Sequence, residues 1–353
     1  MRRFVILAEG SFGPQTSKLA NALLRFAPAE AVAIIDSHRA GRTAQEVIGV
    51  GGGVPVVGSL AEAMLLGPRE LLIGIAPQGG ALPDAYRPVI MEALGAGLDV
   101  WNGLHTLLGE DPTIRTLAAE SGAILHDLRR APSDLALAAG RVRESPATIV
   151  MTVGTDSSVG KMTSLLAVRP TIRLLGHRVA FAATGQTGIL LEGRGIAVDA
   201  VIADFIAGAA ERLTLAAARD ADVVLVEGQG SLIHPAYSGV TLGLLHGAMP
   251  HAMVMCTQPS RTTINRQAWV SIPPLGEVIR LYEAMTESIR PAPVIAVALN
   301  TFDLTDAAAH EAIQRVRNET GLPTTDPVRF GAEPIAQAID QFHRERLALA
   351  RVA

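Results

Sequence analysis

The stretch from Gly154 to Thr163, GTDSSVGKMT, combines the residue types of a phosphate-binding loop. Glycines allow the backbone to curl so that its N–H groups converge on an anion, and Lys161 adds a full positive charge. The spacing is unusual, because five residues separate Gly154 from Gly160 and Met162 stands between Lys161 and Thr163. A glycine turn with a surface lysine is the alternative interpretation. We predict that the loop binds a phosphate group through Gly154, Thr155, Asp156, Ser157, Ser158, Val159, Gly160, Lys161, Met162 and Thr163.

A carboxylate follows a second apolar run. The segment 223–226 has the composition of a buried strand and leads directly into Glu227 and the loop Gly228-Gln229-Gly230. An acid at the end of a strand beside a phosphate loop can hold Mg²⁺ or position a reacting group. We therefore predict that Glu227 takes part in the chemistry and that the glycine loop contacts the substrate. His234, farther along, is either a base or substrate ligand, or a structural histidine.

Other polar residues near predicted strand ends extend the candidate site. Asp204 either binds a metal ion or a substrate amine, or caps the helix that follows it. Arg261 and Arg266 suit carboxylate binding because guanidinium forms bidentate pairs, although surface arginines are the alternative. Asn300 suits a purine base or an ordinary turn. The loop after the strand at 178–184 is either a plain turn or a substrate loop that uses Gly185, Gln186 and Thr187.

Alternating strand and helix patterns position these residues and predict an α/β fold with two domains. Near the N-terminus, a strand at 4–8, a glycine turn, a helix at 16–26 and a strand ending at Asp36 have the outline of a dinucleotide-binding unit. The fingerprint is incomplete, because the glycines of the turn do not form G-x-G-x-x-G. We therefore expect a Rossmann-like parallel sheet that holds no nucleotide.

The C-terminal part repeats the strand–loop–helix order around the phosphate loop, which predicts a second parallel sheet, of the P-loop NTPase type, with flanking helices. The polar segment 141–146 ends in a proline, so we place the domains at 1–145 and 146–353. Just before it, Pro132-Ser133-Asp134 predicts the start of a short helix leading to Gly140. Pro170 predicts a kink in the helix at 165–175.

The composition excludes several classes of protein. The chain has 353 residues, of which 49% are apolar and 18% charged, so it can bury a large core. The net charge of −4, without a basic block, argues against a nucleic-acid partner. No apolar run is long enough to span a membrane or to serve as a signal peptide. The single Cys256 excludes an intramolecular disulfide and a multi-cysteine metal site. We expect a cytoplasmic protein, and the apolar composition suits a homo-oligomer.

The motifs of the C-terminal part resemble those of dethiobiotin synthetase, a branch of the phosphate-loop proteins. The resemblance rests on the loop from Gly154 to Lys161, on Glu227-Gly228-Gln229-Gly230 and on Asn300. It implies that the wide loop spacing is normal, that the strand-end acid belongs to the metal and phosphate site, and that the late asparagine contacts adenine. Met162 departs from the pattern by displacing the hydroxyl residue, which weakens the case for Mg²⁺–nucleotide binding through Thr163.

Over essentially all its residues, the chain is similar to a bacterial family long known only as a domain of unknown function. That family has a Rossmann-like N-terminal half and a phosphate-loop C-terminal half, and the most specific matches are 154–163, 184–188 and 227–231. It includes D-glutamate N-acetyltransferases, which act with a partner dehydrogenase in D-amino-acid catabolism. The resemblance implies acetyl transfer from acetyl-CoA to the amine of an acidic D-amino acid, with the nucleotide-like part of coenzyme A in the phosphate loop.

Such a transfer needs a base for the ammonium proton and hydrogen-bond donors for the tetrahedral oxyanion. The sequence does not rank the candidates: Glu227, His234 and Asp204 as the base, the Gly228 and Gly230 N–H groups as oxyanion donors, and Arg261 or Arg266 for the substrate carboxylates. Two other functions stay open. One is an ATP-dependent ligase or carboxylase of the dethiobiotin synthetase type, which would use ATP with Mg²⁺. The other is a non-catalytic nucleotide-binding protein.

Overall fold

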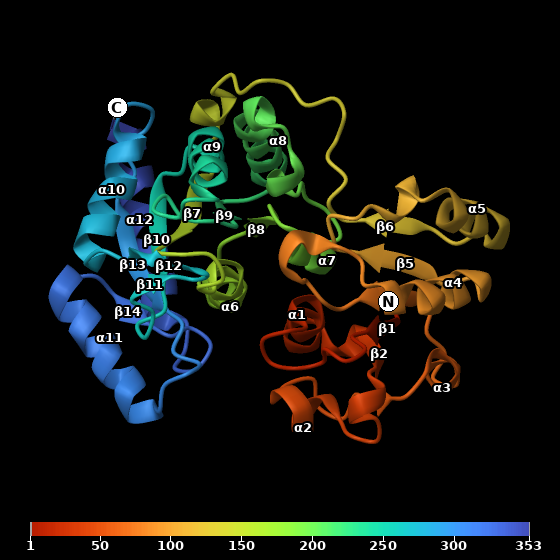
Figure 1. Ribbon diagram of the computed structural model, residues 1–353. Helices are drawn as coiled ribbons and strands as arrows, with labels where there is room; N and C mark the ends of the chain where they lie inside the picture. Colours follow the sequence, from red (N-terminus) through yellow and green to blue (C-terminus); the bar gives the residue numbers. More distant parts are fainter. Residues whose placement is uncertain (1, 353) are drawn as a thin grey trace. The chain divides into compact units, whose positions relative to one another are not determined.

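The computed structural model describes residues 2–352 and divides them into two compact units (Figure 1). Among these residues, the N-terminal unit comprises 2–131 together with Ile189–Ala200, and the C-terminal unit comprises Pro132–Gly188 and 201–352. The segment 132–145, which the sequence assigned to the first domain, belongs to the second unit by its contacts. The functional domain bounds 1–145 and 146–353 stay a prediction.

The N-terminal unit is built on a six-stranded parallel sheet with the strand order β3-β2-β1-β4-β5-β6. This order is that of the dinucleotide-binding fold, so the predicted Rossmann-like architecture is confirmed. The strands are β1 (Phe4–Leu7), β2 (Ala31–Ile35), β3 (Val56–Val57), β4 (Glu70–Ile73), β5 (Asp99–Asn102) and β6 (Leu125–Asp127). The helices are α1 (Lys18–Phe26), α2 (Ala44–Ile48), α3 (Leu60–Met64), α4 (Arg87–Gly95) and α5 (Pro112–Ser121).

The turn between β1 and α1 is closed by a buried carboxylate. The N–H groups of Gly10 and Phe12 donate to the two oxygens of Asp36, at 3.3 and 3.0 Å. The Gly13 N–H donates to Ser17 Oγ at 3.1 Å. In dinucleotide-binding proteins the N–H groups of this turn face a pyrophosphate. Here they bind side chains of the unit itself, and Asp36, 1% exposed, takes the position of an anion.

The C-terminal unit contains a second six-stranded sheet, with the order β14-β13-β10-β7-β9-β8 and parallel pairing throughout. Its strands are β7 (Thr148–Gly154), β8 (Val179–Ala182), β9 (Val223–Val226), β10 (Ala252–Thr257), β13 (Val294–Leu299) and β14 (Thr324–Thr325). A small antiparallel hairpin consists of β11 (Thr263–Ile264) and β12 (Gln267–Ser271). The helices are α6 (Lys161–Leu174), α8 (Ile206–Ala218), α9 (Ser238–Ala248), α10 (Leu275–Glu287), α11 (Asp306–Thr320) and α12 (Glu333–Val352), and α7 (Gln186–Glu192) begins in this unit and ends in the N-terminal one.

The central strands of this sheet are apolar runs buried along their whole length, as expected for a parallel sheet covered on both faces. Helix α6 packs on α12, and α8 packs on α9. The close approach of α8 and α9 depends on glycine, because a Cβ atom at Gly247 would lie 2.0 Å from the carbonyl oxygen of Ala207. The predicted P-loop type of sheet with flanking helices is confirmed.

Two segments of the C-terminal unit differ from the structure that the sequence predicted. The short helix predicted after Pro132 is wrong, because the segment runs in irregular conformation along α8. The N–H groups of Ala139 and Arg141 donate to the Glu211 carboxylate, both at 3.0 Å, instead of to a helical turn. The predicted helix at 165–175 starts earlier, at Lys161, and continues through Pro170 to Leu174. Within residues 2–352, no helix is both long and apolar enough to cross a membrane.

We expect Gly247→Ala to destabilise the C-terminal unit, because the new methyl group would collide with the backbone of α8. Overpacking of this kind costs about 1–3 kcal/mol, and each kcal/mol lowers Tm by about 2–4 °C in a domain of this size. Thermal unfolding measures the effect. The control is Gly239→Ala on the same helix, where nothing lies within 4 Å of the added Cβ atom. Equal Tm values for the two variants would contradict the packing described for α8 and α9.

Candidate active site

The candidate site lies at the carboxyl ends of the C-terminal sheet, where β7 is flanked by β9 and β10. The phosphate loop follows β7, Glu227 follows β9, and the Thr184–Gly188 loop follows β8. Asn300 follows β13, and its Cβ lies 3.8 Å from the position of a Cβ atom on Gly160. Ligands of open parallel sheets bind at such a point, where neighbouring strands connect in opposite directions. The fold therefore brings most of the predicted residues to one edge.

The phosphate loop is curled tightly over the end of β7. A Cβ atom on Gly154 would lie 2.9 Å from Val159 Cγ2 and 3.0 Å from the carbonyl oxygen of Cys256, so the close approach needs glycine. Ser158 and Gly160 have positive φ angles of 56° and 98°, which turn the loop back on itself before α6 begins. Lys161 is 7% exposed, and its Nζ donates to the carbonyl oxygen of Asp156 at 2.7 Å.

Asp156 fixes the loop to the segment after β10. Its side chain is fully buried, and Oδ2 accepts from Arg261 Nη1 at 2.8 Å and from the Asn265 N–H at 2.7 Å. Arg261 also donates to the Ser157 carbonyl at 2.9 Å and to Gln258 Oε1 at 2.7 Å. Both Nη atoms of Arg261 are thus engaged with the protein. The structure gives this residue a bracing position at the loop, where the sequence predicted a ligand of the substrate.

Glu227 is buried in a nest of hydrogen-bond donors. Its Oε2 accepts from the N–H groups of Thr184 and Gly185 at 3.0 and 3.2 Å, and its Oε1 accepts from Gln229 Nε2 at 3.3 Å. A Cβ atom on Gly188 would lie 2.4 Å from Oε2, so only glycine fits against this carboxylate. Donors on both oxygens stabilise the ionised form and fix its direction. Glu227 therefore has the fixed geometry that a reacting or binding carboxylate requires.

The glycines after Glu227 differ in what they offer a ligand. The Gly228 N–H, predicted as an oxyanion donor, donates to Thr152 Oγ1 at 3.0 Å. A Cβ atom at this glycine would lie 1.8 Å from the Thr152 carbonyl oxygen, so the backbone is held against β7. Gly230 adopts a positive φ of 60°, and no hydrogen bond from its N–H is found within residues 2–352. Of the two predicted oxyanion donors, only Gly230 keeps its N–H available.

His234 is 3% exposed, and one of its ring nitrogens is hydrogen-bonded to the backbone. Its Nδ1 accepts from the Ala236 N–H at 3.1 Å, and its Nε2 lies 3.8 Å from Asp156 Oδ1. Burial lowers the pKa of His234, and Lys161 adds to this effect while Asp156 opposes it. The neutral ring therefore carries its proton on Nε2, facing Asp156, and has no lone pair free for a substrate proton. This arrangement favours a structural histidine.

The remaining predicted residues lie in varied surroundings. Asp204 is exposed on a turn before α8. Arg266 is exposed in the turn of the β11–β12 hairpin, with φ 63°. Gln186 and Thr187 are buried at the start of α7. The Thr187 hydroxyl is buried and has no hydrogen-bond partner in residues 2–352, as expected for a group that meets a ligand.

Met162 has a consequence for metal binding. In P-loop NTPases the residue directly after the lysine supplies the hydroxyl that binds Mg²⁺. Here α6 starts at Lys161, so Met162 occupies that position and Thr163 lies about 100° farther round the helix. The side chains therefore suit the binding of phosphate groups better than that of a Mg²⁺–nucleotide.

Tyr282 is a residue of the site that the sequence did not indicate. It lies on α10, is fully buried, and joins two loops through one hydroxyl. The hydroxyl donates to the Gly154 carbonyl at 2.9 Å and accepts from the Leu232 N–H at 3.1 Å. Burial raises its pKa, so the phenol stays neutral and can serve both bonds. A tyrosine among the apolar residues of an amphipathic helix has no signal that would distinguish it from a packing residue.

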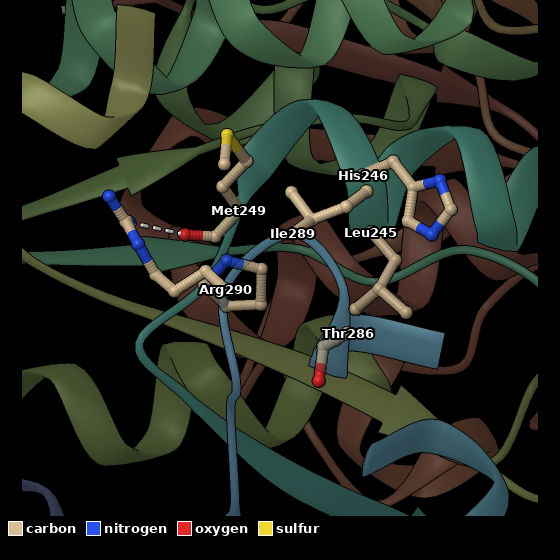
Figure 2. Close-up of a pocket in the computed structure, with 7 residues that line it drawn as sticks. Leu245, His246, Met249, Thr286, Ile289 and Arg290 are labelled. Atoms are coloured by element: carbon tan, nitrogen blue, oxygen red, sulfur yellow. Dashed lines mark hydrogen bonds between the residues drawn. The ribbon is translucent and has the colours of Figure 1, made fainter. Parts of the chain in front are cut away.

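A second hollow lies at the opposite edge of the sheet. Figure 2 shows a hollow at the amino end of β10, where Arg290 Nη1 donates to the Met249 carbonyl at 2.7 Å. Its lining includes Leu245, His246, Thr286 and Ile289, and its internal volume is about 0 Å³. The hollow is too small to hold a ligand.

The fold and the site define a two-domain α/β protein that joins a Rossmann-like unit to a phosphate-loop unit. Two family models match, a Rossmann-like domain of unknown function (DUF1611_N) at residues 37–131 and a P-loop domain of unknown function (DUF1611_C) at residues 136–336. The chain belongs to the DUF1611 family. A crystal structure of a member from Anabaena variabilis is 42% identical with a TM-score of 0.92, covering 97% of this chain and 100% of that one.

Two relatives carry a functional name. The D-glutamate N-acetyltransferase of Tritonibacter scottomollicae is 37% identical over 282 residues, which is 80% of this chain and 84% of the relative. The D-glutamate N-acetyltransferase of a Pseudoalteromonas species is 38% identical over 278 residues, which is 78% of this chain and 83% of the relative. The family resemblance stated from the sequence is confirmed.

We expect Tyr282→Phe to lower the free energy of unfolding by about 1–3 kcal/mol, because it leaves two buried backbone groups without a partner. Urea denaturation measures the loss, and hydrogen exchange at the Leu232 amide should accelerate. Tyr237→Phe, at a position 45% exposed, is the control and should change neither quantity. Unchanged exchange at Leu232 in Tyr282→Phe would show that the hydroxyl does not join the loops.

Proposed function

We propose that this chain is a D-glutamate N-acetyltransferase that moves the acetyl group of acetyl-CoA to the amine of D-glutamate. The observation that carries the proposal is a phosphate loop placed beside the buried Glu227 carboxylate, in a chain related over about four-fifths of its length to two enzymes of that name. Both parts of the site lie on adjacent strands, β7 and β9. The phosphate loop suits a donor that carries phosphates, and the adjacent Glu227 carboxylate suits an acceptor that must lose a proton.

Acetyl-CoA is the proposed donor because coenzyme A contains an ADP-like part with a pyrophosphate. The curled backbone from Gly154 to Gly160 and the Lys161 ammonium group would hold these phosphates without hydrolysing them. Asn300, beside Gly160, is the proposed contact for the adenine or ribose. None of these interactions needs a metal ion, which agrees with Met162 at the position of the usual hydroxyl ligand.

Glu227 is the proposed base. The ammonium group of D-glutamate gives a proton to the Glu227 carboxylate, and the amine nitrogen then attacks the thioester carbonyl. The C–S bond breaks as the tetrahedral intermediate collapses, which forms the amide and releases coenzyme A as a thiolate. The nitrogen loses its second proton during this collapse, and that proton goes to the thiolate sulfur, while the proton held by Glu227 passes to solvent. His234 is disfavoured in this role because its Nδ1 already accepts a backbone hydrogen bond, and Asp204 is disfavoured by its exposure.

The negative oxygen of the intermediate needs a donor, and the Gly230 N–H is the proposed one. For the carboxylates of D-glutamate we propose Gln186 and Thr187, which follow the loop that holds Glu227. The Thr187 hydroxyl supports this assignment, because it is buried without a partner among the described residues. A desolvated donor binds an anion more strongly than one in water.

Three further points are proposals from the family resemblance and the composition. We propose that the enzyme acts in the cytoplasm, where acetyl-CoA is available, and that it forms a homo-oligomer. We also propose that it acts in D-amino-acid catabolism together with a partner dehydrogenase that consumes the acetylated product. Size-exclusion chromatography with light scattering tests the oligomer.

Incubation with acetyl-CoA and D-glutamate should release free thiol in step with N-acetyl-D-glutamate. Glu227→Gln should lower kcat by about 10²–10⁴-fold, because the amide keeps the shape of the side chain but cannot accept the proton. The control Glu311→Gln changes an exposed acid on α11 and should leave kcat unchanged. A wild-type enzyme that releases no thiol but forms ADP from ATP would support the dethiobiotin synthetase type of ligase. ATP binding without any turnover would support a non-catalytic protein.

Removal of divalent cations should leave acetyl transfer unchanged, because Met162 replaces the hydroxyl that would hold Mg²⁺. We expect the same kcat and KM with EDTA as with added MgCl₂. A loss of more than about tenfold on chelation, restored by Mg²⁺, would correspond to about 1.4 kcal/mol of metal-dependent stabilisation and would contradict this assignment.

A further inference from the structure

A polar cavity of about 380 Å³ lies in the C-terminal unit between the β11–β12 hairpin and the segments after β10 and β13. Ligand pockets start at about 300 Å³, so the cavity has room for a nucleoside-sized group. Its lining is mostly polar, although Ile264 and Ala268 also contribute to it. The residues that matter here are Gln258, Ser260, Arg261, Asn265, Arg266 and Asp303.

The cavity adjoins the phosphate loop through shared residues. Arg261 and Asn265 line it, and both donate to Asp156 Oδ2 within the loop, at 2.8 and 2.7 Å. Arg261 also donates to the Ser157 carbonyl at 2.9 Å. The cavity and the phosphate loop are therefore neighbours, joined directly by these two residues.

The charges of the cavity are mixed. Arg261 is paired with Asp156, and Arg266 also belongs to the lining, in the hairpin turn. Asp303 supplies a carboxylate, held by Ser260 Oγ at 2.6 Å and Gln258 Nε2 at 3.0 Å. Burial opposes ionisation of Asp303, yet these hydrogen bonds keep its pKa below the usual value. Such a lining suits a ligand that has both an anionic group and N–H or O–H donors.

The backbone at Arg266 also points to a function. Arg266 adopts a left-handed φ of 63°, although asparagine or glycine is favoured at such a position. A non-glycine residue in this region costs about 1 kcal/mol or more. An arginine thus stands in the hairpin turn at a position where glycine or asparagine would adopt the backbone conformation more easily.

We propose that this cavity holds the 3′-phosphoadenosine end of coenzyme A, with Arg266 on the 3′-phosphate and Asp303 on an N–H or O–H donor of the adenine or ribose. The proposal rests on the proposed function, since it assumes a coenzyme A thioester as donor. It assigns Arg266 to the donor instead of to the carboxylates of D-glutamate. It also explains how a phosphate loop could prefer coenzyme A to ATP, which has no 3′-phosphate.

Calorimetric titration of the full chain with two nucleotides tests the proposal without any turnover. Adenosine 3′,5′-bisphosphate should bind about 10–100-fold more tightly than adenosine 5′-monophosphate, as one charge-assisted contact to an arginine would provide. Arg266→Gln should reduce the ratio to within about threefold, because the guanidinium contact is lost. The control Arg315→Gln removes the same charge from an exposed site on α11 and should keep the full ratio.

Equal affinities of the wild-type protein for the two nucleotides would overturn the proposal. So would a full preference in Arg266→Gln, or a variant whose only defect is a raised KM for D-glutamate. Failure of the proposed function has a different signature, since it appears as absent thiol release from acetyl-CoA. The nucleotide preference is measured whether or not that reaction occurs.

Discussion

The buried carboxylate of Asp156 is the interaction on which the rest of the site depends. It is fully buried, and it accepts hydrogen bonds from its neighbour Ser157, from Arg261 and from the hairpin backbone at Asn265. Loss of one partner from a buried ion pair typically costs about 3–5 kcal/mol, because an uncompensated charge is left behind. Asp156 thus holds the loop in its curled form, while its carbonyl oxygen receives the Lys161 ammonium group. These contacts within the protein itself fix the shape of the anion site.

The strand order explains why a second carboxylate lies beside this loop. Because β9 pairs with both β7 and β8, the residues after these strands meet at one edge. Glu227 binds the N–H groups that follow β8, and Gly228 binds Thr152 on β7. Tyr282 completes the connection by joining Gly154 to Leu232. The phosphate loop and Glu227, the proposed base, are therefore held at a fixed separation by contacts that span three strands and a helix.

The sequence predicted those parts of the site that depend on local patterns. The phosphate loop, Glu227 after an apolar strand, and two parallel sheets all follow from glycine spacing and from runs of buried residues. Other parts depend on tertiary contacts. Nothing in the pattern around Pro132 indicates that Glu211 takes up the backbone donors of that segment, and the turn at Arg266 has an unusual residue for its left-handed φ. The role of Arg261 could not be predicted from the sequence either, because a guanidinium that braces a loop has the same sequence signal as one that binds a substrate.

We propose that the phosphate loop binds the acetyl donor and not the acceptor. Steady-state kinetics of Lys161→Ala, with each substrate varied in turn, test it most directly. Loss of a charged hydrogen bond costs about 1.5–3 kcal/mol, so KM for acetyl-CoA should rise by about 10–150-fold while KM for D-glutamate stays within about threefold. An unchanged KM for acetyl-CoA, or a rise confined to D-glutamate, would contradict the account.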